Sequence, residues 1–289
     1  MTEYLARLFY LGDRYHGSQY QLGVETVQGK LIDAISSWSG ETHTPQTVQP
    51  SGRTDRGVHS IGQLVMVHTN KHFDVDRINK HLPEDIQLWA ATRAPSEFKP
   101  RYSVLMRHYR YYLPDTWKEL DHVAVKDAIN RLIGSNDYNP LSKPDDGRNT
   151  MTTVVNISLQ QDKNRFWLDI MGTRFLWKLV RKIITLLSDV GTGEIRPDEI
   201  SDILTGKISI PSGIRPAPPE NLVLIESVVP LRFTTSKYAL RKILAILKER
   251  FEYYDRSMRS LDSIIDFFSE PMTTSQYSTK KQTHSEIED

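Results

Sequence analysis

The order of strand-type and helix-type segments constrains the fold of this chain more than any other feature. Alternating or β-branched apolar runs predict strands, and apolar residues at helical spacing predict helices. The expected strands cover residues 3–11, 63–69, 86–92, 105–113, 152–160, 165–171 and 222–229. One expected helix begins after Thr26, a candidate N-cap. The other expected helices cover residues 74–82, 121–133, 175–190, 197–204 and 236–268. This order predicts an α+β fold of two related units with mostly antiparallel strands.

The same order suggests where the chain divides. We expect an N-terminal α+β half at residues 1–104, a C-terminal α+β half at 105–232, and a helical extension with a disordered tail at 233–289. Four prolines within residues 210–219 predict a rigid loop there. Acidic and basic side chains balance in the extension, so it is not expected to be an electrostatic arm. It is expected either to pack on the body or to contact a second copy.

Composition excludes several classes of protein. The chain contains no cysteine, which excludes disulfides, zinc ribbons, iron–sulfur clusters and a cysteine nucleophile. No apolar run approaches the roughly 18 residues of a membrane span, and the N-terminus alternates like a strand, so we expect a cytoplasmic protein without a membrane partner. The formal net charge is +1, so a polyanion would have to bind at local basic patches.

The densest group of polar residues lies between two glycines, Gly52 and Gly57. Arg53, Asp55 and Arg56 stand between them. One interpretation is an ordinary turn with a salt bridge. The other is a carboxylate kept ionised by guanidinium groups, able to act as a nucleophile or base, with positive charge left for a phosphate.

Two basic segments supply what such a site would need. Residues 93–112 contain five Arg or Lys against one acid, with four tyrosines interleaved, a composition typical of a platform for single-stranded RNA. Strand alternation places Arg107, Tyr109 and Tyr111 on one face, which alternatively belongs to the core. Residues 172–184 contain four basic side chains and no acid. Among them Arg181 lies by an apolar helix face and should have a carboxylate partner.

These segments and several others follow one another in the order of a known family. The pattern Gly-Arg-Thr-Asp-x-Gly-Val-His-x-x-Gly-Gln occupies residues 52–63, and further motifs lie at residues 10–17, 26–29, 82–86, 98–102, 107–111, 175–181 and 217–222. Over about residues 4–230, the chain resembles the TruA family of tRNA pseudouridine synthases. The resemblance implies the pseudouridine synthase fold, in which two RRM-like (ferredoxin-like) halves form a central, mostly antiparallel sheet flanked by helices.

The resemblance also implies a reaction. The family isomerises uridine to pseudouridine at positions 38, 39 and 40 of the tRNA anticodon arm, as a homodimer and without a cofactor or metal. Its catalytic residues map to Asp55, the nucleophile, to Tyr109, and to Arg181, which pairs with the aspartate. Whether the aspartate attacks C6 of the uracil or acts through a glycal is left open.

The substrate contacts of the family map in the same way. Arg53 corresponds to the arginine that helps to flip the target base, and Leu222 to a leucine that lines the uracil pocket. Tyr109 and Arg107 are expected to contact substrate as well. The expected partner is tRNA rather than DNA.

Departures from the family and rival functions remain. Ser18 stands where tryptophan is usual, which affects packing of the first loop, and Asn221 replaces a glycine. An RNA-binding module without catalysis would use the same basic strands but would not need Asp55 in a glycine-flanked loop. A metal-dependent hydrolase could be built from histidines, although their spacing is irregular: His59, His68 and His72.

Overall fold

The protein is described by a computed structural model that covers residues 1–143, 149–163 and 165–269. The chain forms two compact units, Met1–Arg241 and Lys242–Asp289. Within the described residues, no helix is both long enough and apolar enough to cross a membrane.

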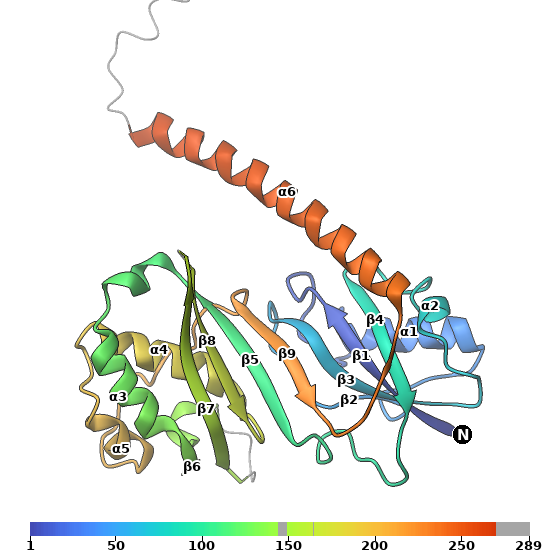
Figure 1. Cartoon of the computed structure of the whole chain (residues 1–289), viewed down its shortest axis with the longest axis horizontal. Helices are drawn as coiled ribbons and strands as arrows, with labels where there is room; N and C mark the ends of the chain where they lie inside the picture. Colours follow the sequence, from blue (N-terminus) through green and yellow to red (C-terminus); the bar gives the residue numbers. More distant parts are fainter. Residues whose placement is uncertain (144–148, 164, 270–289) are drawn as a thin grey trace, which may run out of the picture. The chain divides into compact units, whose positions relative to one another are not determined.

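One large sheet organises the first unit (Figure 1). Among the described residues it has ten strands: β1 (Thr2–Tyr10), β2 (Val48–Pro50), β3 (His59–Thr69), β4 (Ile86–Arg93), β5 (Met106–Leu113), β6 (Gly134–Asp137), β7 (Met151–Asp162), β8 (Arg165–Gly172), β9 (Leu222–Val228) and β10 (Thr234–Thr235). Their order is β10-β4-β1-β3-β9-β5-β8-β7-β6, and β2 pairs with β3. Every pairing is antiparallel except β3 with β9, which is parallel. Through that pairing and its antiparallel pairing with β5, β9 joins the two series of elements into one sheet.

Helices accompany both ends of the sheet (Figure 1). The helical segments are α1 (Val27–Ser39), α2 (Val75–Ile78), α3 (His122–Leu132), α4 (Leu179–Gly191), α5 (Glu199–Leu204) and α6 (Lys237–Ser269), with short 3₁₀ turns at Asp115–Glu119 and Asn139–Leu141. Thr26 caps α1 as expected, because its hydroxyl accepts a hydrogen bond from the backbone N–H of Gly29 at 3.2 Å.

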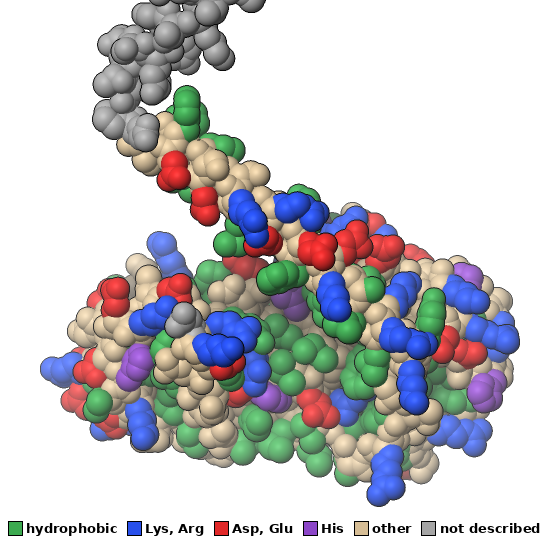
Figure 2. Space-filling view, turned by 45° about the horizontal axis from the view of Figure 1, so that its top comes forward, with side chains coloured by type: hydrophobic (Ala, Val, Ile, Leu, Met, Phe, Trp, Pro, Cys, Tyr) green, Lys and Arg blue, Asp and Glu red, His purple; other side chains and the backbone are tan. Residues whose placement is uncertain are grey.

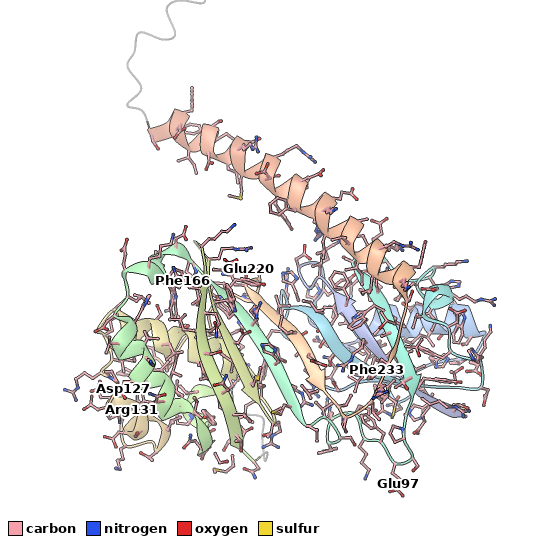
Figure 3. All side chains as sticks on the ribbon, viewed as in Figure 1. Glu97, Asp127, Arg131, Phe166, Glu220 and Phe233 are labelled. Carbon is pink, nitrogen blue, oxygen red and sulfur yellow. The ribbon has the colours of Figure 1, made fainter. Side chains whose placement is uncertain are left out.

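Each group of helices buries its own apolar core. Leu31 and Ile35 of α1 pack in a cluster with Leu8 and Val65 of the sheet. A larger cluster joins α3, α4 and α5 to β5, β7, β8 and β9. Burying one Leu, Ile or Val side chain in such a cluster contributes about 1.5–3 kcal/mol to the free energy of folding. The outer face of α3 is polar, and Asp127 and Arg131 form an ion pair there (Figure 3).

The structure confirms the expected α+β architecture with a large, mostly antiparallel sheet flanked by helices. The pairing of two RRM-like halves and the boundaries at residues 104 and 232 stay predictions. Three short strands, β2, β6 and β10, were not expected. The helix expected at residues 175–190 begins only at Leu179, because Lys178 has a left-handed backbone with φ of 66°. The residues just before Leu179 therefore lie outside the helix, and the position of the Trp177 side chain depends on this.

Candidate active site

Asp55 lies on a tight loop between β2 and β3. The loop depends on Gly57, whose φ of 88° favours glycine. A Cβ atom at Gly57 would also lie only 2.8 Å from Cγ of Pro219, in the proline-rich loop. The side chain of Asp55 is 21% exposed, so it reaches the surface while most of it is shielded from water.

The first loop of the chain supports the residue next to Asp55. The Ser18 hydroxyl accepts a hydrogen bond from the backbone N–H of Thr54 at 2.7 Å, and the Ser18 N–H donates to the Thr54 carbonyl at 3.1 Å. The hydroxyl groups of Tyr10 and Thr54 are 2.8 Å apart. Ser18 is buried. Ser18, which stands where the family usually has tryptophan, therefore fixes the backbone of the loop that carries Asp55.

Two donors from the start of α4 hold the carboxylate of Asp55. Nη1 of Arg181 is 2.7 Å from Oδ2, and the indole Nε1–H of Trp177 donates to Oδ1 at 2.9 Å. Each oxygen thus has its own donor, and the pair of contacts fixes both the position and the rotation of the carboxylate.

Arg181 is itself held by the proline-rich loop. Its Nε donates to the carbonyl of Ala217 at 2.5 Å, and the backbone N–H of Ala217 donates back to the carbonyl of Arg181 at 3.0 Å. The Arg181 side chain is 12% exposed. The guanidinium thus joins Asp55 to the proline-rich loop. The sequence predicted a carboxylate partner for Arg181 but not the contact with this loop.

Tyr109 and Leu222 lie on the neighbouring strands β5 and β9, and both are buried. The ring of Tyr109 packs edge-to-face on Phe175, with centroids 5.3 Å apart. Burial raises the pKa of Tyr109 above its ordinary value, and the nearby negative charge of Asp55 acts in the same direction. Tyr109 is therefore protonated at neutral pH.

Arg107 is buried, and backbone oxygens surround its guanidinium. It donates to the carbonyls of Ser51 at 2.7 Å, Thr173 at 2.9 Å and Arg101 at 3.2 Å. These carbonyls come from three separate segments, including the strand-to-loop junction before Asp55. The contacts indicate a role in positioning the loop; substrate contact by Arg107 stays a prediction.

The expected RNA platform is smaller than its sequence indicates. Tyr111 is buried, and Arg110 pairs with Asp169 through two hydrogen bonds of 2.9 Å. The exposed members of the segment are Arg93, Lys99, Arg101, Tyr102 and Tyr112.

Further cations lie close to Asp55 itself. Arg53 and Arg56 on the loop are exposed. Nζ of Lys143 lies 4.3 Å from the ring centroid of Trp177, and Nζ of Lys178 lies 5.6 Å from it. The carboxylate therefore sits within a positively charged surround, which suits a polyanionic substrate.

The three histidines considered as metal ligands do not converge. Nδ1 of His59 accepts a hydrogen bond from the backbone N–H of Gly12 at 3.0 Å, whereas His68 faces Glu3 at 3.4 Å. His72 is exposed. Within the ranges that the structure describes, no group of three His, Cys, Asp or Glu side chains is placed to hold a metal ion.

Comparison with known proteins assigns the family. A family model described as tRNA pseudouridine synthase matches residues 128–228. The tRNA pseudouridine synthase A of Methanothermobacter thermautotrophicus is 33% identical over 260 residues, which cover 88% of this chain and 92% of that protein. The chain belongs to the tRNA pseudouridine synthase A family. The family protein of Methanosarcina acetivorans is 36% identical over 76% of this chain and 81% of its own length, and that of Pyrococcus abyssi is 32% identical over 85% and 92%.

In this tRNA pseudouridine synthase, the structure shows a contact of Asp55 that its sequence did not reveal, the indole of Trp177. Trp177 falls within residues 175–190, where one continuous helix was expected. The later start of α4 instead lets its indole reach Asp55. The only signal in the sequence was a large aromatic residue between Phe175 and Lys178 in a segment free of acids.

Proposed function

We propose that this chain isomerises uridine to pseudouridine at positions 38, 39 and 40 of the tRNA anticodon arm, with Asp55 as the nucleophile. Membership of the family supports the reaction. The observation that carries the assignment to Asp55 is its geometry: a carboxylate on a glycine-dependent loop, held by Arg181 at 2.7 Å and open to solvent on one side.

The reaction rearranges one nucleotide without loss or gain of atoms. The bond between N1 of uracil and C1′ of the ribose breaks, the uracil rotates, and C5 bonds to C1′ while the C5 proton leaves and N1 gains one. Asp55 acts either as a nucleophile that adds to C6 of the uracil or as the base that removes the C2′ proton to form a glycal; in the second route that proton returns to C2′ when C5 bonds to C1′. An isomerisation of this kind requires no cofactor and no metal.

The target uridine must leave the base stack before Asp55 can reach it, at a cost of a few kcal/mol. Arg53 is exposed on the same loop, two residues before Asp55, and can enter the space that the base leaves. Leu222 lines the uracil pocket and excludes water from it. Because Tyr109 is protonated at neutral pH, it is better suited to contact the uracil ring than to act as the base that removes the C5 proton.

The surrounding charges support tRNA as the partner. Arg56, Lys143 and Lys178 can bind phosphates on either side of the flipped nucleotide. By the resemblance to the family we also expect a homodimer in the cytoplasm.

Release of tritium from tRNA labelled at uridine C5 tests the reaction. We expect release that persists in EDTA and is abolished in Asp55→Asn, because an amide cannot act as the nucleophile. Asp33→Asn, on the exposed face of α1, is the matched control and should retain full activity. If no unmodified tRNA released tritium, the proposal would fail, and loss of release in EDTA would favour a metal-dependent enzyme.

Two further measurements separate catalysis from binding and define the sites. Asp55→Asn should bind tRNA with nearly unchanged affinity; an RNA-binding module would bind tRNA equally well in both forms but release no tritium in either. Pseudouridine at positions 38–40 should disappear from the tRNA of a strain that lacks the protein. Persistence of pseudouridine there would show that the substrate site is different.

A further inference from the structure

Helix α6 carries a regular apolar seam. Its 33 residues form one unbroken helix (Figure 1), and hydrophobic side chains lie exposed along it in Figure 2. Nine large apolar residues recur at alternating intervals of four and three, and each is at least 38% exposed: Leu240, Leu244, Leu247, Phe251, Tyr254, Met258, Leu261, Ile265 and Phe268. A strict seven-residue repeat over four heptads is the pattern of a coiled-coil interface.

The positions that flank this seam carry an ordered set of charges. Along one flank, the first two residues are basic and the last two are acidic: Arg241, Lys248, Asp255 and Asp262. Along the other flank, isoleucines stand at both ends: Ile243, Arg250, Ser257 and Ile264. Reversing the direction of the helix therefore exchanges basic for acidic residues on the first flank and leaves isoleucines at both ends of the second.

We propose that α6 pairs with α6 of a second copy of this chain as an antiparallel coiled coil. In the register centred on Phe251 and Tyr254, each Phe251 faces Tyr254 of the second copy, and each Leu244 faces Leu261. The contact is symmetric, because residue i meets residue j and residue j meets residue i. The same register also sets Leu240 against Ile265 and Leu247 against Met258, so eight of the nine seam residues meet one another, and Phe268 faces Lys237 of the second copy.

The flanking residues favour this orientation. In the antiparallel register Arg241 faces Asp262 of the second copy, Lys248 faces Asp255, and Ile243 faces Ile264. Each of these pairs occurs twice in the dimer. Opposite charges across the seam therefore coincide with apolar contact at its ends.

A parallel pair would use the same seam less well. Flanking positions then meet five residues apart, so Ile243 would face Lys248 of the second copy, and only Arg250 with Asp255 would be complementary. Asp255 also pairs with Arg259 of its own helix at 2.7 Å, which weakens its contact with a second copy in either orientation, so the Arg241–Asp262 pairs make the difference. The charge pattern thus selects the antiparallel form.

A second copy fits the seam better than other occupants. The balanced charge of the extension gives no attraction for RNA, and self-complementarity of both flanks has no reason to arise on a helix that covers its own body. This interface is independent of the proposed reaction. A dimer that forms through another surface would say nothing about the register of α6. The experiment must therefore detect contacts between the two α6 helices themselves.

Because the chain has no cysteine, engineered cysteines report contacts in the full-length protein. Leu244→Cys and Leu261→Cys proteins, one with a size tag, are mixed and oxidised. We expect a disulfide between the two different proteins. Leu244→Cys alone should not cross-link to itself, since the two sites would lie about 25 Å apart at 1.5 Å per residue, beyond disulfide reach. Arg256→Cys, on the face opposite the seam, is the control for random collision.

Charge reversal provides the second measurement. In the mixed cysteine proteins, Lys248→Glu should slow cross-linking several-fold, and adding Asp255→Lys should restore it, because the pair is then reversed but intact. In a parallel pair, Leu244→Cys of one copy and Leu261→Cys of the other would lie about 25 Å apart, so the mixed proteins would not cross-link above the collision control, whatever the charges at residues 248 and 255. Three results would each overturn the proposal. The first is a disulfide between two Leu244→Cys proteins, and the second is cross-linking of Leu244→Cys to Leu261→Cys that is no faster than cross-linking to the Arg256→Cys control. The third is a double variant that cross-links as slowly as Lys248→Glu alone.

Discussion

Trp177 donates its indole N–H to Oδ1 of Asp55 at 2.9 Å, while the opposite oxygen faces Arg181. The two donors come from one short segment, on either side of a residue with a left-handed backbone, Lys178. This arrangement lets a single helix start control the direction of the carboxylate. It also places a half-exposed aromatic ring beside the carboxylate.

Loss of the indole donor should weaken catalysis while the ring remains. Trp177→Phe removes a hydrogen bond to a charged group, worth about 1 kcal/mol at this exposed position, so we expect a roughly fivefold lower single-turnover rate. Trp167→Phe is the matched control, because it also removes an indole–carboxylate bond, to Asp169 at 3.1 Å. Equal effects of both changes on the rate would argue against a role for Trp177 at Asp55.

Arg181 should not be replaceable by lysine. An ammonium keeps the charge but cannot reach Asp55 and the Ala217 carbonyl together, so Arg181→Lys should lower the single-turnover rate by about tenfold or more. Arg174→Lys serves as the control, since Arg174 contacts only the carbonyls of Asn149 and Met151 among its described hydrogen-bond partners. An Arg181→Lys enzyme as fast as the control would show that the bridge is dispensable.

Arg107 should act mainly on stability. Arg107→Met leaves three backbone carbonyls without their donor, at about 1 kcal/mol each, so the free energy of unfolding should fall by about 3 kcal/mol. Urea unfolding measures this, with the exposed Arg101→Met as control. If the affinity for tRNA fell while unfolding stayed unchanged, Arg107 would instead be a direct substrate contact.

The Ser18 hydroxyl should affect both the free energy of unfolding and the rate of the reaction. Ser18→Ala removes the acceptor of the buried Thr54 N–H, which should lower the free energy of unfolding by about 1–2 kcal/mol and slow the reaction as Asp55 shifts. Unfolding in urea and tritium release are measured on the same preparation. Ser96→Ala, on an exposed loop, should change neither quantity. Normal activity in a destabilised Ser18→Ala protein would separate the loop from catalysis.

Stability should fall in mild acid because of His43. Burial lowers the pKa of His43 below its ordinary value of 6.5, although the charge of Glu41 partly opposes this. The unfolded chain therefore takes up a proton at a pH where the folded chain does not, and the free energy of unfolding decreases as the pH falls below about 6.5. His43→Gln should reduce this decrease in urea titrations at pH 7.5 and 5.5. The exposed His72→Gln should not, and equal behaviour of the two would exclude His43 as the source.

Local periodicity was sufficient to predict most of the elements. The cap at Thr26, the helix α3 and the paired strands β7 and β8 all arise where the sequence pattern repeats over several residues. Strands of two to four residues, such as β2 and β10, carry no such pattern, because their hydrogen bonds come from a partner strand distant in the sequence.

The sequence by itself determined the α+β class, the chemistry available at Asp55 and the heptad seam of α6, since each depends on residue type and spacing. The family resemblance already implied that Arg181 pairs with Asp55, whereas only the tertiary structure showed Trp177 as a second donor to that carboxylate. A left-handed residue shortened α4 and turned Trp177 toward the loop, and the proline-rich segment fixed Arg181 from more than thirty residues away. Such contacts join segments far apart in the chain, so they depend on how the sheet brings its strands together rather than on any local pattern.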